Sequence, residues 1–436
     1  MALSTQPYKG ARDFYPEDKR VQKYLFDSLR KTVERFGYEE YDAPILESQD
    51  LYLAKTGEEI VNEQTYTFQD RGGRNVVIRP EMTPTVSRMV AARRQELAYP
   101  LRWYSIPNLW RYERPQRGRL REHWQLNVDI FGLQDAQAEV EIISVANRIL
   151  KDFGAKADMY EIRLNSRVFM DHVLHDYLGL DAVESQSVAK LIDRMHKLDR
   201  SAFIAQADAA ITPAKREAGT VEKLLEVLHT KRIASLPEEL KHHQALKNLQ
   251  EMFDQLKAVG IANAVFDITL MRGFDYYTDV VFEIFDTDTE NNRSMMGGGR
   301  YDGLVGLFGV EPVATVGFGL GDVTLANFLE THHLLPKPNV ETDIFVAILG
   351  GNVKAAQRPI NELRQMGLNV AVGAYGRKLG DQFKVADKKG ITYLMVVGEQ
   401  ELESEQFTIK NLHTGVEEKH GLARIVGLVK DRRNHT

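Results

Sequence analysis

The chain has 436 residues, more than one hydrophobic core usually supports, so two or three domains are expected. Hydrophobic residues make up 43% and charged residues 27%, which is typical of a folded globular protein. The absence of cysteine excludes disulfides, zinc–thiolate sites and cysteine nucleophiles, and the net charge of −6 argues against an indiscriminate coat for nucleic acid, though not against a local basic surface.

The first residues show no targeting segment. They lack the basic start and the long apolar run of a signal peptide, and no stretch approaches the roughly 18 apolar residues of a membrane span. We therefore expect a cytoplasmic protein with no membrane partner.

Residues 1–165 mix helices with long strands in which polar and apolar residues alternate. Residues 75–81 form a predicted strand, and Thr83 is predicted to cap a helix that has Pro84 at its first position. Taken alone, Glu81 is best interpreted as a surface acid before a turn.

The most informative stretch runs from Leu101 to Gly132 and contains all three tryptophans. We predict two long strands joined by a loop, residues 114–121, that carries four arginines. On the return strand the side chains alternate, so that one face is apolar and the other is polar. The polar face carries His123, Gln125, Asn127 and Asp129. On the outgoing strand, Arg111 and Glu113 are two residues apart and should share a face.

Two interpretations of this hairpin remain open from the residue pattern. Antiparallel sheets with one solvent-exposed face are common, and alternation alone favours that interpretation. The composition favours a ligand site, because guanidinium groups pair bidentately with phosphate. In that case Glu113 would accept a hydrogen bond from the amino group of a purine, and Gln125 and Asp129 would bind a small polar ligand.

The rest of the chain divides by pattern. Residues 166–257 are almost wholly helical, whereas residues 258–330 return to strands and glycine-rich turns. Because the helical region lies between two strand-rich regions, we interpret it as an insertion into one larger domain. Prolines mark a linker at residues 331–341, and the alternating strands and helices of residues 342–436 predict a small α/β domain.

Three stretches in the second strand-rich region combine glycine with aromatic or charged residues. They are Leu270–Thr278, Gly297–Val305 and Gly317–Gly321. Each is also a frequent type of turn or strand entry. However, Arg272 beside Tyr276 and Tyr277 is a sound design for binding an anion next to an aromatic wall. Asp322, which follows the third stretch, is interpreted as a helix N-cap rather than a catalytic acid.

In the C-terminal region, the helix predicted near residues 378–389 has one apolar and one polar face. The polar face carries Lys378, Gln382 and Lys388. A solvated charged face and a surface for RNA explain this pattern equally well.

The stretch with Arg111 and Glu113, together with its basic loop, resembles the second signature motif of class II aminoacyl-tRNA synthetases, in the form of the histidyl-tRNA synthetases. In that family the matching arginine holds the α-phosphate of ATP and the matching acid contacts adenine. The loop also approaches the acceptor end of tRNA, which implies tRNA contacts for Gln116 and Arg117. Residues 37–45 resemble the first motif, which forms the dimer interface, so a homodimer is implied.

Two further stretches resemble motifs peculiar to histidyl-tRNA synthetases. The first implies that Arg272 is catalytic together with Arg111, that Arg272 contacts ATP, and that Tyr276 and Tyr277 wall the histidine pocket. The second, Gly297–Val305, implies that Tyr301 lines the same pocket.

The Arg-Pro-Glu-x-Thr segment is similar to one that binds the amino acid in this family. The resemblance implies that Glu81 and Thr83 engage the histidine α-amino group. We expect Gln125 and Asp129, on the polar face of the hairpin, to read the histidine side chain and α-amino group as well.

The third class II motif is a glycine-rich strand followed by a helix that carries an arginine for the γ-phosphate. Gly317–Gly321 matches the strand, but Thr324 occupies the position of the arginine. We expect Arg119 and Arg121, together with ATP-bound Mg²⁺, to offset the γ-phosphate charge instead.

The resemblance covers nearly the whole chain and implies four regions. Residues 1–165 and 258–330 would form an α+β catalytic domain built on an antiparallel sheet, like that of the class II synthetases. Residues 166–257 would be its helical insertion, residues 331–341 a linker, and residues 342–436 an α/β anticodon-binding domain.

The implied activity is attachment of L-histidine to tRNA(His) through a histidyl-adenylate, with ATP and Mg²⁺ but no prosthetic group. Lys378 and Gln382 would then approach the anticodon. Two alternatives are a synthetase-like regulatory subunit that binds histidine without charging tRNA, and a synthetase for proline or threonine.

Overall fold

The computed structural model describes residues 3–53, 64–271, 276–351 and 353–433. The contacts between residues divide the chain into two compact units. The larger unit comprises the chain up to Asp13 and Leu25–Leu335, and the smaller comprises Phe14–Tyr24 and Pro336–Thr436.

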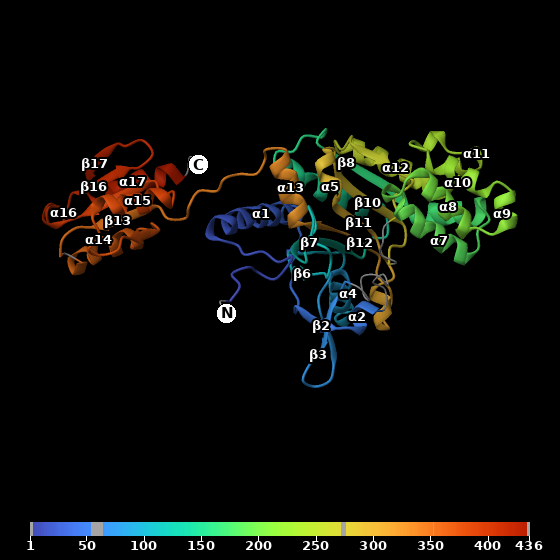
Figure 1. Ribbon diagram of the computed structural model, residues 1–436, viewed down its shortest axis with the longest axis horizontal. Helices are drawn as coiled ribbons and strands as arrows, with labels where there is room; N and C mark the ends of the chain where they lie inside the picture. Colours follow the sequence, from blue (N-terminus) through green and yellow to red (C-terminus); the bar gives the residue numbers. More distant parts are fainter. Residues whose placement is uncertain (1–2, 54–63, 272–275, 352, 434–436) are drawn as a thin grey trace. The chain divides into compact units, whose positions relative to one another are not determined.

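The larger unit is organised around a sheet of nine described strands, seen near the centre of Figure 1. Their order is β1-β5-β7-β12-β11-β10-β8-β9, and β6 pairs with β7 in addition. Among the described strands of this sheet, only the outer pairs β1/β5 and β8/β9 are parallel. The predicted α+β fold on a mainly antiparallel sheet is therefore confirmed. The bounds are β1 Glu39–Glu40, β5 Leu101–Ser105, β6 Asn108–Trp110, β7 Glu122–Phe131, β8 Tyr160–Ser166, β9 Ala264–Phe266, β10 Val280–Asp286, β11 Ser294–Arg300 and β12 Thr315–Gly321.

One face of this sheet forms the hydrophobic core. The strand register aligns Val128 of β7 with Phe318 of β12, and Phe282 of β10 lies on the same face. Helix α5 packs on this face through residues at helical spacing, all fully buried: Ile142, Val145, Ala146 and Ile149. The longer helices of the unit are α1 Pro16–Glu34, which both units share, α4 Thr83–Ala92, α5 Gln137–Asp152, α12 Gln244–Ala258 and α13 Asp322–Thr331.

The opposite face of β11 and β12 is almost without side chains. Its glycines are Gly297, Gly299, Gly317, Gly319 and Gly321. The register aligns Gly317 with Asp129 and Gly319 with Asn127, so the polar side chains of β7 emerge on this face. A Cβ at Gly317 would overlap Asp129 Oδ1, and one at Gly319 would lie 2.6 Å from Gln125 Nε2. The glycines therefore leave the room that Gln125 and Asp129 occupy; we call this surface the glycine floor.

The hairpin of the sequence analysis is partly as predicted. The alternation along β7 is confirmed, but Asp129 is buried rather than solvent-exposed. The outgoing segment is two short strands, β5 and β6, interrupted at Pro107, which has no N–H for the ladder. Placing Arg111 and Glu113 on one strand face was wrong, because both lie beyond β6. There the Glu113 N–H donates to the Arg111 carbonyl over 2.8 Å, which makes a tight turn.

Two predicted helix caps were also wrong. Helix α4 has Met82 as its N-cap, without a side-chain cap bond, and Thr83 is its first residue. Helix α13 has Gly321 as its N-cap, and Asp322 lies inside the helix. The Asp322 carboxylate instead links distant segments of the chain, because it accepts hydrogen bonds from the Trp124 N–H at 2.9 Å and from Arg12 at 2.7 Å.

A small sheet with order β2-β4-β3 precedes α4. Its strands are β2 Leu46–Ser48, β3 Tyr66–Gln69 and β4 Asn75–Ile78, and the short helix α2 Asp50–Leu53 lies beside it. Strand β4 confirms the strand predicted at residues 75–81, although it ends earlier. The segment after β4 leads Glu81 and α4 towards the glycine floor, as the contacts below establish.

Between β8 and β9 the chain is helical, as predicted, and these helices gather at one end of the unit (Figure 1). Their bounds are α6 Arg167–His172, π-helix η1 Val173–Tyr177, α7 Ala182–Asp193, η2 Met195–Lys197, α8 Arg200–Ala210, α9 Pro213–Glu217, α10 Thr220–Leu228, η3 Ile233–Ser235 and α11 Glu238–Lys241, followed by α12. Two short 3₁₀ helices, η4 Thr289–Asn291 and η5 Val305–Phe308, flank β11.

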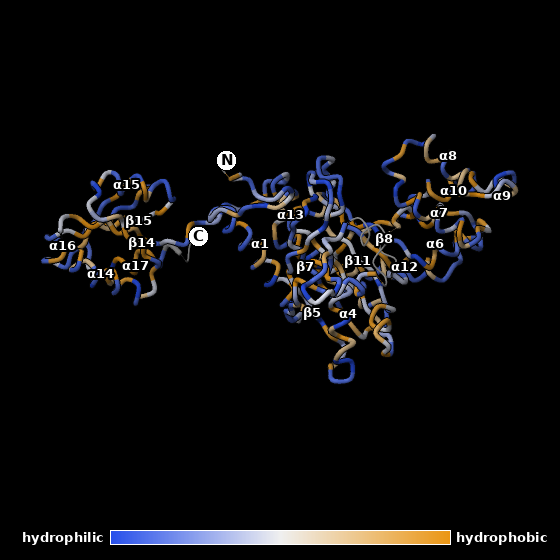
Figure 2. The backbone as a smooth tube through the Cα atoms, turned by 60° about the horizontal axis from the view of Figure 1, so that its bottom comes forward, coloured by the Kyte–Doolittle hydropathy of each residue, from blue (hydrophilic) through white to orange (hydrophobic). Residues whose placement is uncertain are grey.

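The smaller unit has a five-stranded sheet among its described residues, in the order β14-β13-β15-β16-β17. The first three strands along the chain are parallel, as predicted, and an unpredicted antiparallel hairpin, β16–β17, extends the sheet. Hydrophobic segments lie around β14, β15 and α17, whereas α16 at the rim is more hydrophilic (Figure 2). The bounds are β13 Ile344–Ile348, α14 Val353–Gln365, β14 Val370–Val372, α15 Leu379–Lys388, β15 Tyr393–Val397, α16 Glu399–Ser404, β16 Phe407–Asn411, β17 Glu417–His420 and α17 Leu422–Arg433.

In the described parts of both units, no helix combines the length and the apolar character that crossing a membrane would need.

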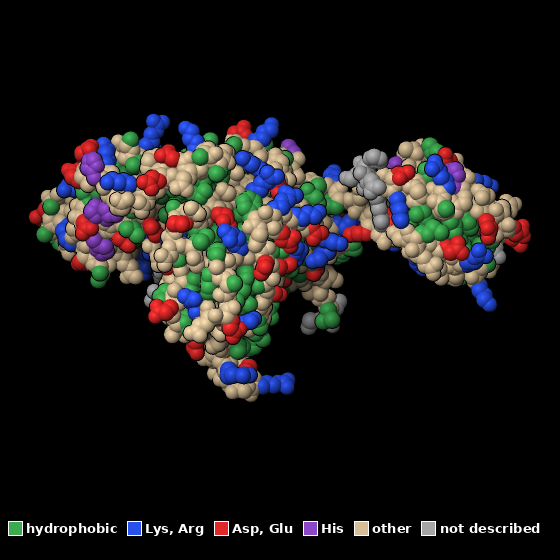
Figure 3. Space-filling view, turned by 180° about the vertical axis from the view of Figure 1, so that it is seen from behind, with side chains coloured by type: hydrophobic (Ala, Val, Ile, Leu, Met, Phe, Trp, Pro, Cys, Tyr) green, Lys and Arg blue, Asp and Glu red, His purple; other side chains and the backbone are tan. Residues whose placement is uncertain are grey.

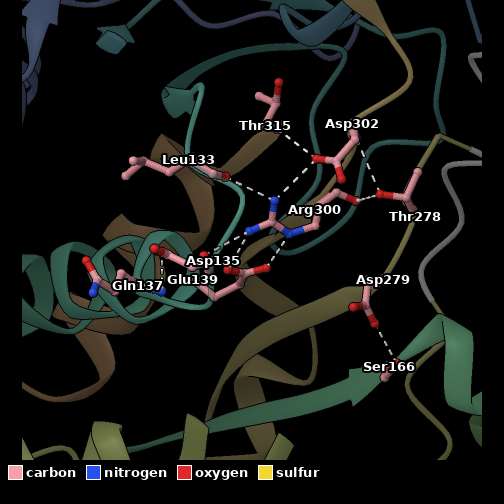
Figure 4. A network of polar contacts seen from close by, with 10 residues as sticks. All are labelled: Leu133, Asp135, Gln137, Glu139, Ser166, Thr278, Asp279, Arg300, Asp302 and Thr315. Atoms are coloured by element: carbon pink, nitrogen blue, oxygen red, sulfur yellow. Dashed lines mark hydrogen bonds and ion pairs between the residues drawn. The ribbon is translucent and has the colours of Figure 1, made fainter. Parts of the chain in front are cut away.

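A buried ion pair fastens the end of β11 to α5 (Figure 4). Arg300 donates to both oxygens of Glu139, at 2.6 and 2.8 Å, and also to the carbonyls of Leu133 and Asp135 at 3.2 Å. The two side chains are only 8% and 3% exposed. Asp302 joins the network and accepts from the Thr315 N–H at 2.8 Å. This network fixes the backbone on both sides of Tyr301.

Substituting Arg300 by Gln should lower the free energy of unfolding by about 3–5 kcal/mol, because it leaves the Glu139 carboxylate buried and unpaired. Denaturant unfolding followed by circular dichroism measures the change. Arg148→Gln is the matched control, since the Arg148–Asp152 pair on α5 is more exposed and is worth less than about 1 kcal/mol. Equal small losses in both variants would contradict the role given to Arg300.

Candidate active site

Three tyrosines from separate segments meet beside the glycine floor. Tyr276 and Tyr277 precede β10, and Tyr301 follows β11; all three are buried. The ring centroids of Tyr276 lie 4.9 Å from Tyr277 and 5.6 Å from Tyr301. The predicted aromatic wall is therefore assembled from residues that the sequence analysis drew from two motifs.

Each of two buried carboxylates is hydrogen-bonded to one of these tyrosines. The Tyr276 hydroxyl donates to Glu81 Oε2 at 3.2 Å, and the Tyr301 hydroxyl donates to Asp129 Oδ1. Glu81 is 2% exposed and Asp129 is 3% exposed, so the interpretation of Glu81 as a surface acid is excluded. Buried carboxylates cost free energy unless a cation or several donors accompany them. The pair is suited to a small ligand that carries N–H groups.

Asp129 has a strongly perturbed pKa. Burial raises the pKa of Asp129 to about 7, and the hydrogen bond from Tyr301 opposes this rise. Burial, followed by the nearby Asp129 carboxylate, raises the pKa of Tyr301 well above its ordinary value, so this hydroxyl stays protonated and donates. Near neutral pH the Asp129 side chain is therefore balanced between its neutral and anionic forms, and a ligand with N–H donors would favour the anion.

The raised pKa of Asp129 predicts a pH-dependent stability. Between about pH 4 and pH 7 the folded protein binds this proton and the unfolded chain does not, so stability falls as pH rises, by at most about 1.4 kcal/mol per pH unit. Asp129→Asn removes this contribution and should gain stability relative to the wild type from pH 5 to pH 7. Thermal unfolding of both proteins at pH 5, 6, 7 and 8 measures it. Parallel curves would show that Asp129 titrates normally.

A cationic region continues from the acidic pocket along the hairpin. The Arg111 Nε donates to the Pro80 carbonyl at 2.8 Å, which connects the hairpin to the segment that carries Glu81. Burial and then three arginines, Arg111, Arg12 and Arg119, lower the pKa of His123 to about 3. Burial is the main cause of this low pKa, and the three arginines add positive charge of the kind that suits a polyphosphate.

Glu113 and Arg119 form an ion pair within this region. Arg119 Nε lies 2.6 Å from Glu113 Oε2, and the glutamate is almost buried. The loop closes in a tight turn, in which Gln116 and Arg119 exchange both backbone hydrogen bonds at 2.9 Å. Gly118 at the third turn position has φ +73°, a left-handed conformation that glycine adopts without strain. The turn therefore returns Arg119 towards Glu113.

Arg121 has a different environment from Arg119. Its guanidinium lies 3.9 Å from the centroid of the Tyr112 ring and donates to the Tyr8 hydroxyl at 3.0 Å and to the Glu113 carbonyl at 3.1 Å. These contacts attach the N-terminal segment to the hairpin. They engage donors of Arg121 that a phosphate would otherwise use.

The remaining predicted residues lie in several places. Thr83 is partly buried at the start of α4, and Gln125 donates to Asn127 Oδ1 at 2.7 Å on the glycine floor. Arg117 donates to Asn291 Oδ1 at 3.0 Å and to Thr331. Arg272 lies outside the described residues. Gln116 is exposed at the loop.

In the smaller unit, Lys378 is the exposed N-cap of α15. The prediction that Gln382 shares this exposed face was wrong, because its side chain is 2% exposed. Gln382 Nε2 donates to the Arg377 carbonyl at 3.0 Å, and a Cβ at Gly373 would overlap Gln382 Oε1. A glycine opposite the helix admits the amide, and this packing overrides the helical-wheel pattern.

Sequence reasoning missed several residues that shape the site. Arg300 lies inside a motif that was noted for Tyr301, and Tyr52 donates to the Glu81 carbonyl at 3.2 Å. Tyr41 is a further example: burial raises the pKa of its hydroxyl, and the nearby Asp129 carboxylate raises this pKa further. The alternating glycines of β11 and β12 were the available signal, since glycine at every second strand position marks one side-chain-free face.

The residues fit a metal ion delivered by a ligand. Among the described residues, no group of three or more histidine, aspartate or glutamate side chains could hold a metal ion. A Mg²⁺ that accompanies a nucleotide needs only phosphates, water and one or two carboxylates. Glu283 of β10 is aligned with Gly297 on the glycine-floor side, and its side chain is a carboxylate of this kind.

A solved structure shares this architecture. The apo histidyl-tRNA synthetase from S. aureus matches with a TM-score of 0.71 and 26% sequence identity, covering 98% of this chain and 100% of that chain. The fold is thus that of a class II aminoacyl-tRNA synthetase.

Sequence comparisons specify the family. The family model described as histidyl-tRNA synthetase matches residues 10–322, and the one described as an anticodon binding domain matches residues 343–432. A histidine–tRNA ligase from Leptospira biflexa is 44% identical over 414 residues, 94% of each chain. Another, from Thermoplasma volcanium, is 38% identical over 95% of this chain and 96% of that protein. The chain belongs to the histidyl-tRNA synthetase family.

Proposed function

We propose that this chain is a histidine–tRNA ligase that attaches L-histidine to tRNA(His) at the expense of ATP, and that histidine binds over the glycine floor. The observation that carries this proposal is the pair of buried carboxylates, Glu81 and Asp129, each bonded to a tyrosine. Glu81 and Thr83 would hold the α-amino group. Asp129, with Gln125 beside it, would accept from the imidazole N–H.

In the first step, the histidine carboxylate attacks the α-phosphorus of ATP in line, the bond to the β-phosphate oxygen breaks, and pyrophosphate leaves. Arg111, anchored on the Pro80 carbonyl, would stabilise the charge that develops on the α-phosphate. Glu113 would accept from the adenine amino group. Mg²⁺ bound with ATP would neutralise phosphate charge, with Glu283 as its candidate protein ligand. Arg272 remains a predicted catalytic residue.

In the second step, the terminal ribose hydroxyl of the tRNA attacks the carbonyl carbon of the adenylate, and AMP leaves. The chain supplies position rather than covalent chemistry, because the acid pair holds one end of the adenylate and the arginines hold the other. Gln116 at the exposed loop would contact the acceptor end. Arg117 would have to exchange its bond to Asn291 for one to RNA.

Neither alternative from the sequence analysis is favoured. A regulatory subunit without charging activity would not need the anticodon-binding domain that the C-terminal region matches. Proline has no nitrogen besides its α-amino group, and the threonine side chain has a hydroxyl but no N–H, so neither substrate offers a side-chain N–H to a second buried carboxylate. Two assays test the function directly: pyrophosphate exchange with histidine, proline or threonine, and charging of tRNA(His). Exchange with histidine alone, followed by charging, is expected. Exchange without charging would favour the regulatory subunit.

We also propose that exposed lysines of the smaller unit bind tRNA. On the face shown in Figure 3, this unit carries basic, acidic and hydrophobic side chains side by side, so single lysines rather than one large basic patch would make the contact. Lys378→Ala should then raise the KM for tRNA and reduce the salt dependence of binding by about one phosphate contact.

Histidine-dependent pyrophosphate exchange by Lys378→Ala should be unchanged, because the adenylate site lies within the larger unit. Lys419→Ala is the matched control, since Lys419 is also exposed but belongs to the edge strand β17. If the Lys419 variant weakens charging as much as the Lys378 variant does, the loss is not specific to the α15 surface, and a tRNA contact at Lys378 is contradicted.

The exposed edge of the central sheet supports a homodimer. Strand β1 is exposed, and Ile45 and Leu46 just beyond it are 45% and 46% exposed. Strand β1 and Ile45 lie within the stretch whose resemblance implied a dimer interface, and Leu46 directly follows it. Sedimentation equilibrium tests this, and a monomer at micromolar concentration would contradict it.

A further inference from the structure

A second cation faces the tip of the arginine-rich loop. Arg293 lies between η4 and the start of β11 and is partly buried. A Cβ at Gly118 in the loop would lie 3.1 Å from Arg293 Cδ and 3.4 Å from Thr324 Cγ2. The loop tip, Arg293 and the start of α13 therefore meet. They line a small hollow together with Arg117 and the acid that pairs with it, Glu290, and with Asn291 and Asn327.

Arg293 makes no hydrogen bond or ion pair with any residue that the structure describes. Arg119 is its cationic neighbour, and Glu113, already paired with Arg119, is its acidic neighbour. Burial and then Arg119 lower the pKa of Arg293, and Glu113 raises it. Three arginines, Arg117, Arg119 and Arg293, thus accompany two carboxylates, Glu113 and Glu290. The positive charge that remains uncompensated lies in a partly buried place, which favours an anion there.

Because the Thr324 side chain is short, it leaves room for the Arg293 side chain near Gly118. The Thr324 hydroxyl donates to the Gly321 carbonyl at 3.0 Å and can donate to the Met295 carbonyl at 3.3 Å, so its short side chain folds back on its own helix. A long side chain at position 324 would enter the space beside Gly118 where Arg293 now lies. A guanidinium therefore reaches this place from the β11 side instead of from α13.

The cations are arranged in a sequence of neighbours. Arg111 contacts the Pro80 carbonyl, Arg119 pairs with Glu113 in the loop, and Arg293 lies against Gly118 at the loop tip. This order extends from the segment that carries Glu81 to the start of α13. A polyphosphate whose α-phosphate lies at Arg111 would thus direct its tail towards Arg119 and Arg293. Arg121, engaged by Tyr8 and Tyr112, does not belong to this sequence.

We propose that Arg293, together with Arg119, binds the β- and γ-phosphates of ATP, and thus the pyrophosphate that leaves, and that it offsets the charge for which Thr324 provides no cation. This inference deepens the proposed function and rests on it, because it assigns the end of the ATP site. It also replaces Arg121 by Arg293 in the pair that we expected from the sequence.

The test is calorimetric titration of Arg293→Ala with ATP, pyrophosphate, AMP and histidine, each in the presence of MgCl₂. Affinity for ATP and pyrophosphate should fall about ten- to hundred-fold, the range of one charge-assisted hydrogen-bonded contact. Affinity for AMP and histidine should change less than about twofold, since neither ligand reaches the hollow. Arg293→Lys should keep part of the affinity. Arg148→Ala on α5 is the control and should behave as the wild type.

A second variant separates phosphate binding from a structural role. Arg293→Ala combined with Thr324→Arg places a guanidinium in the same space from α13 and should recover most of the lost affinity for pyrophosphate. Unchanged ATP and pyrophosphate binding in Arg293→Ala would overturn the inference. If the affinities for AMP and histidine fall as much as those for ATP and pyrophosphate, Arg293 has a structural role and the inference is overturned. If only the KM for tRNA changes, Arg293 contacts RNA and the inference is likewise overturned.

These titrations need no catalysis, so the inference and the proposed function can fail separately. A wild-type protein without histidine-dependent pyrophosphate exchange would refute the function, whatever Arg293 binds. Normal exchange by the wild type, together with unaltered pyrophosphate affinity of the Arg293 variant, would refute the inference alone.

Discussion

The site depends on a surface from which side chains are missing. Glycines at alternate positions of β11 and β12 leave a floor on which Gln125 and Asp129 can lie flat, and even one added Cβ would meet them. On the reverse side of the same strands, Phe318 and Leu320 are buried in the core that α5 covers. One pair of strands thus both anchors the unit and exposes its backbone to a ligand, because strand side chains alternate between faces.

Charge is distributed over this floor in a way that matches the two ends of an aminoacyl-adenylate. Glu81 and Asp129 accompany the tyrosines at one end, and the arginines around His123 occupy the other. The Arg300–Glu139 pair takes no part in this chemistry, yet it holds the backbone beside Tyr301. Electrostatic preorganisation requires such supports, since groups that must reorient during reaction stabilise charge less well.

Much of the architecture follows from patterns with a single period. The alternation along β7 was predictable because successive side chains of a strand point to opposite faces wherever the strand lies. The parallel strands of the C-terminal unit were predictable because strands and helices alternate along the sequence. Helix caps were not, because Asp322 accepts from Trp124 and Arg12, which lie far from it in sequence. Gln382 was misplaced because Gly373 makes room for it. Arg293 lies in a bend just before β11, where no sequence pattern marks it as a site residue. Only the folded structure brings it close to Gly118.

Titration of L-histidine into the Gly317→Ala variant tests whether histidine binds over the glycine floor. A Cβ at position 317 would occupy the place of the Asp129 carboxylate, whereas Gly303→Ala places its Cβ where nothing lies within 4 Å and serves as the control. Circular dichroism verifies that both variants fold. We expect Gly317→Ala to bind histidine at least about a hundredfold more weakly than the wild type, which is equivalent to about 2.7 kcal/mol. Gly303→Ala should bind histidine as the wild type does. Wild-type affinity in a folded Gly317→Ala protein would contradict the assignment of histidine to the glycine floor.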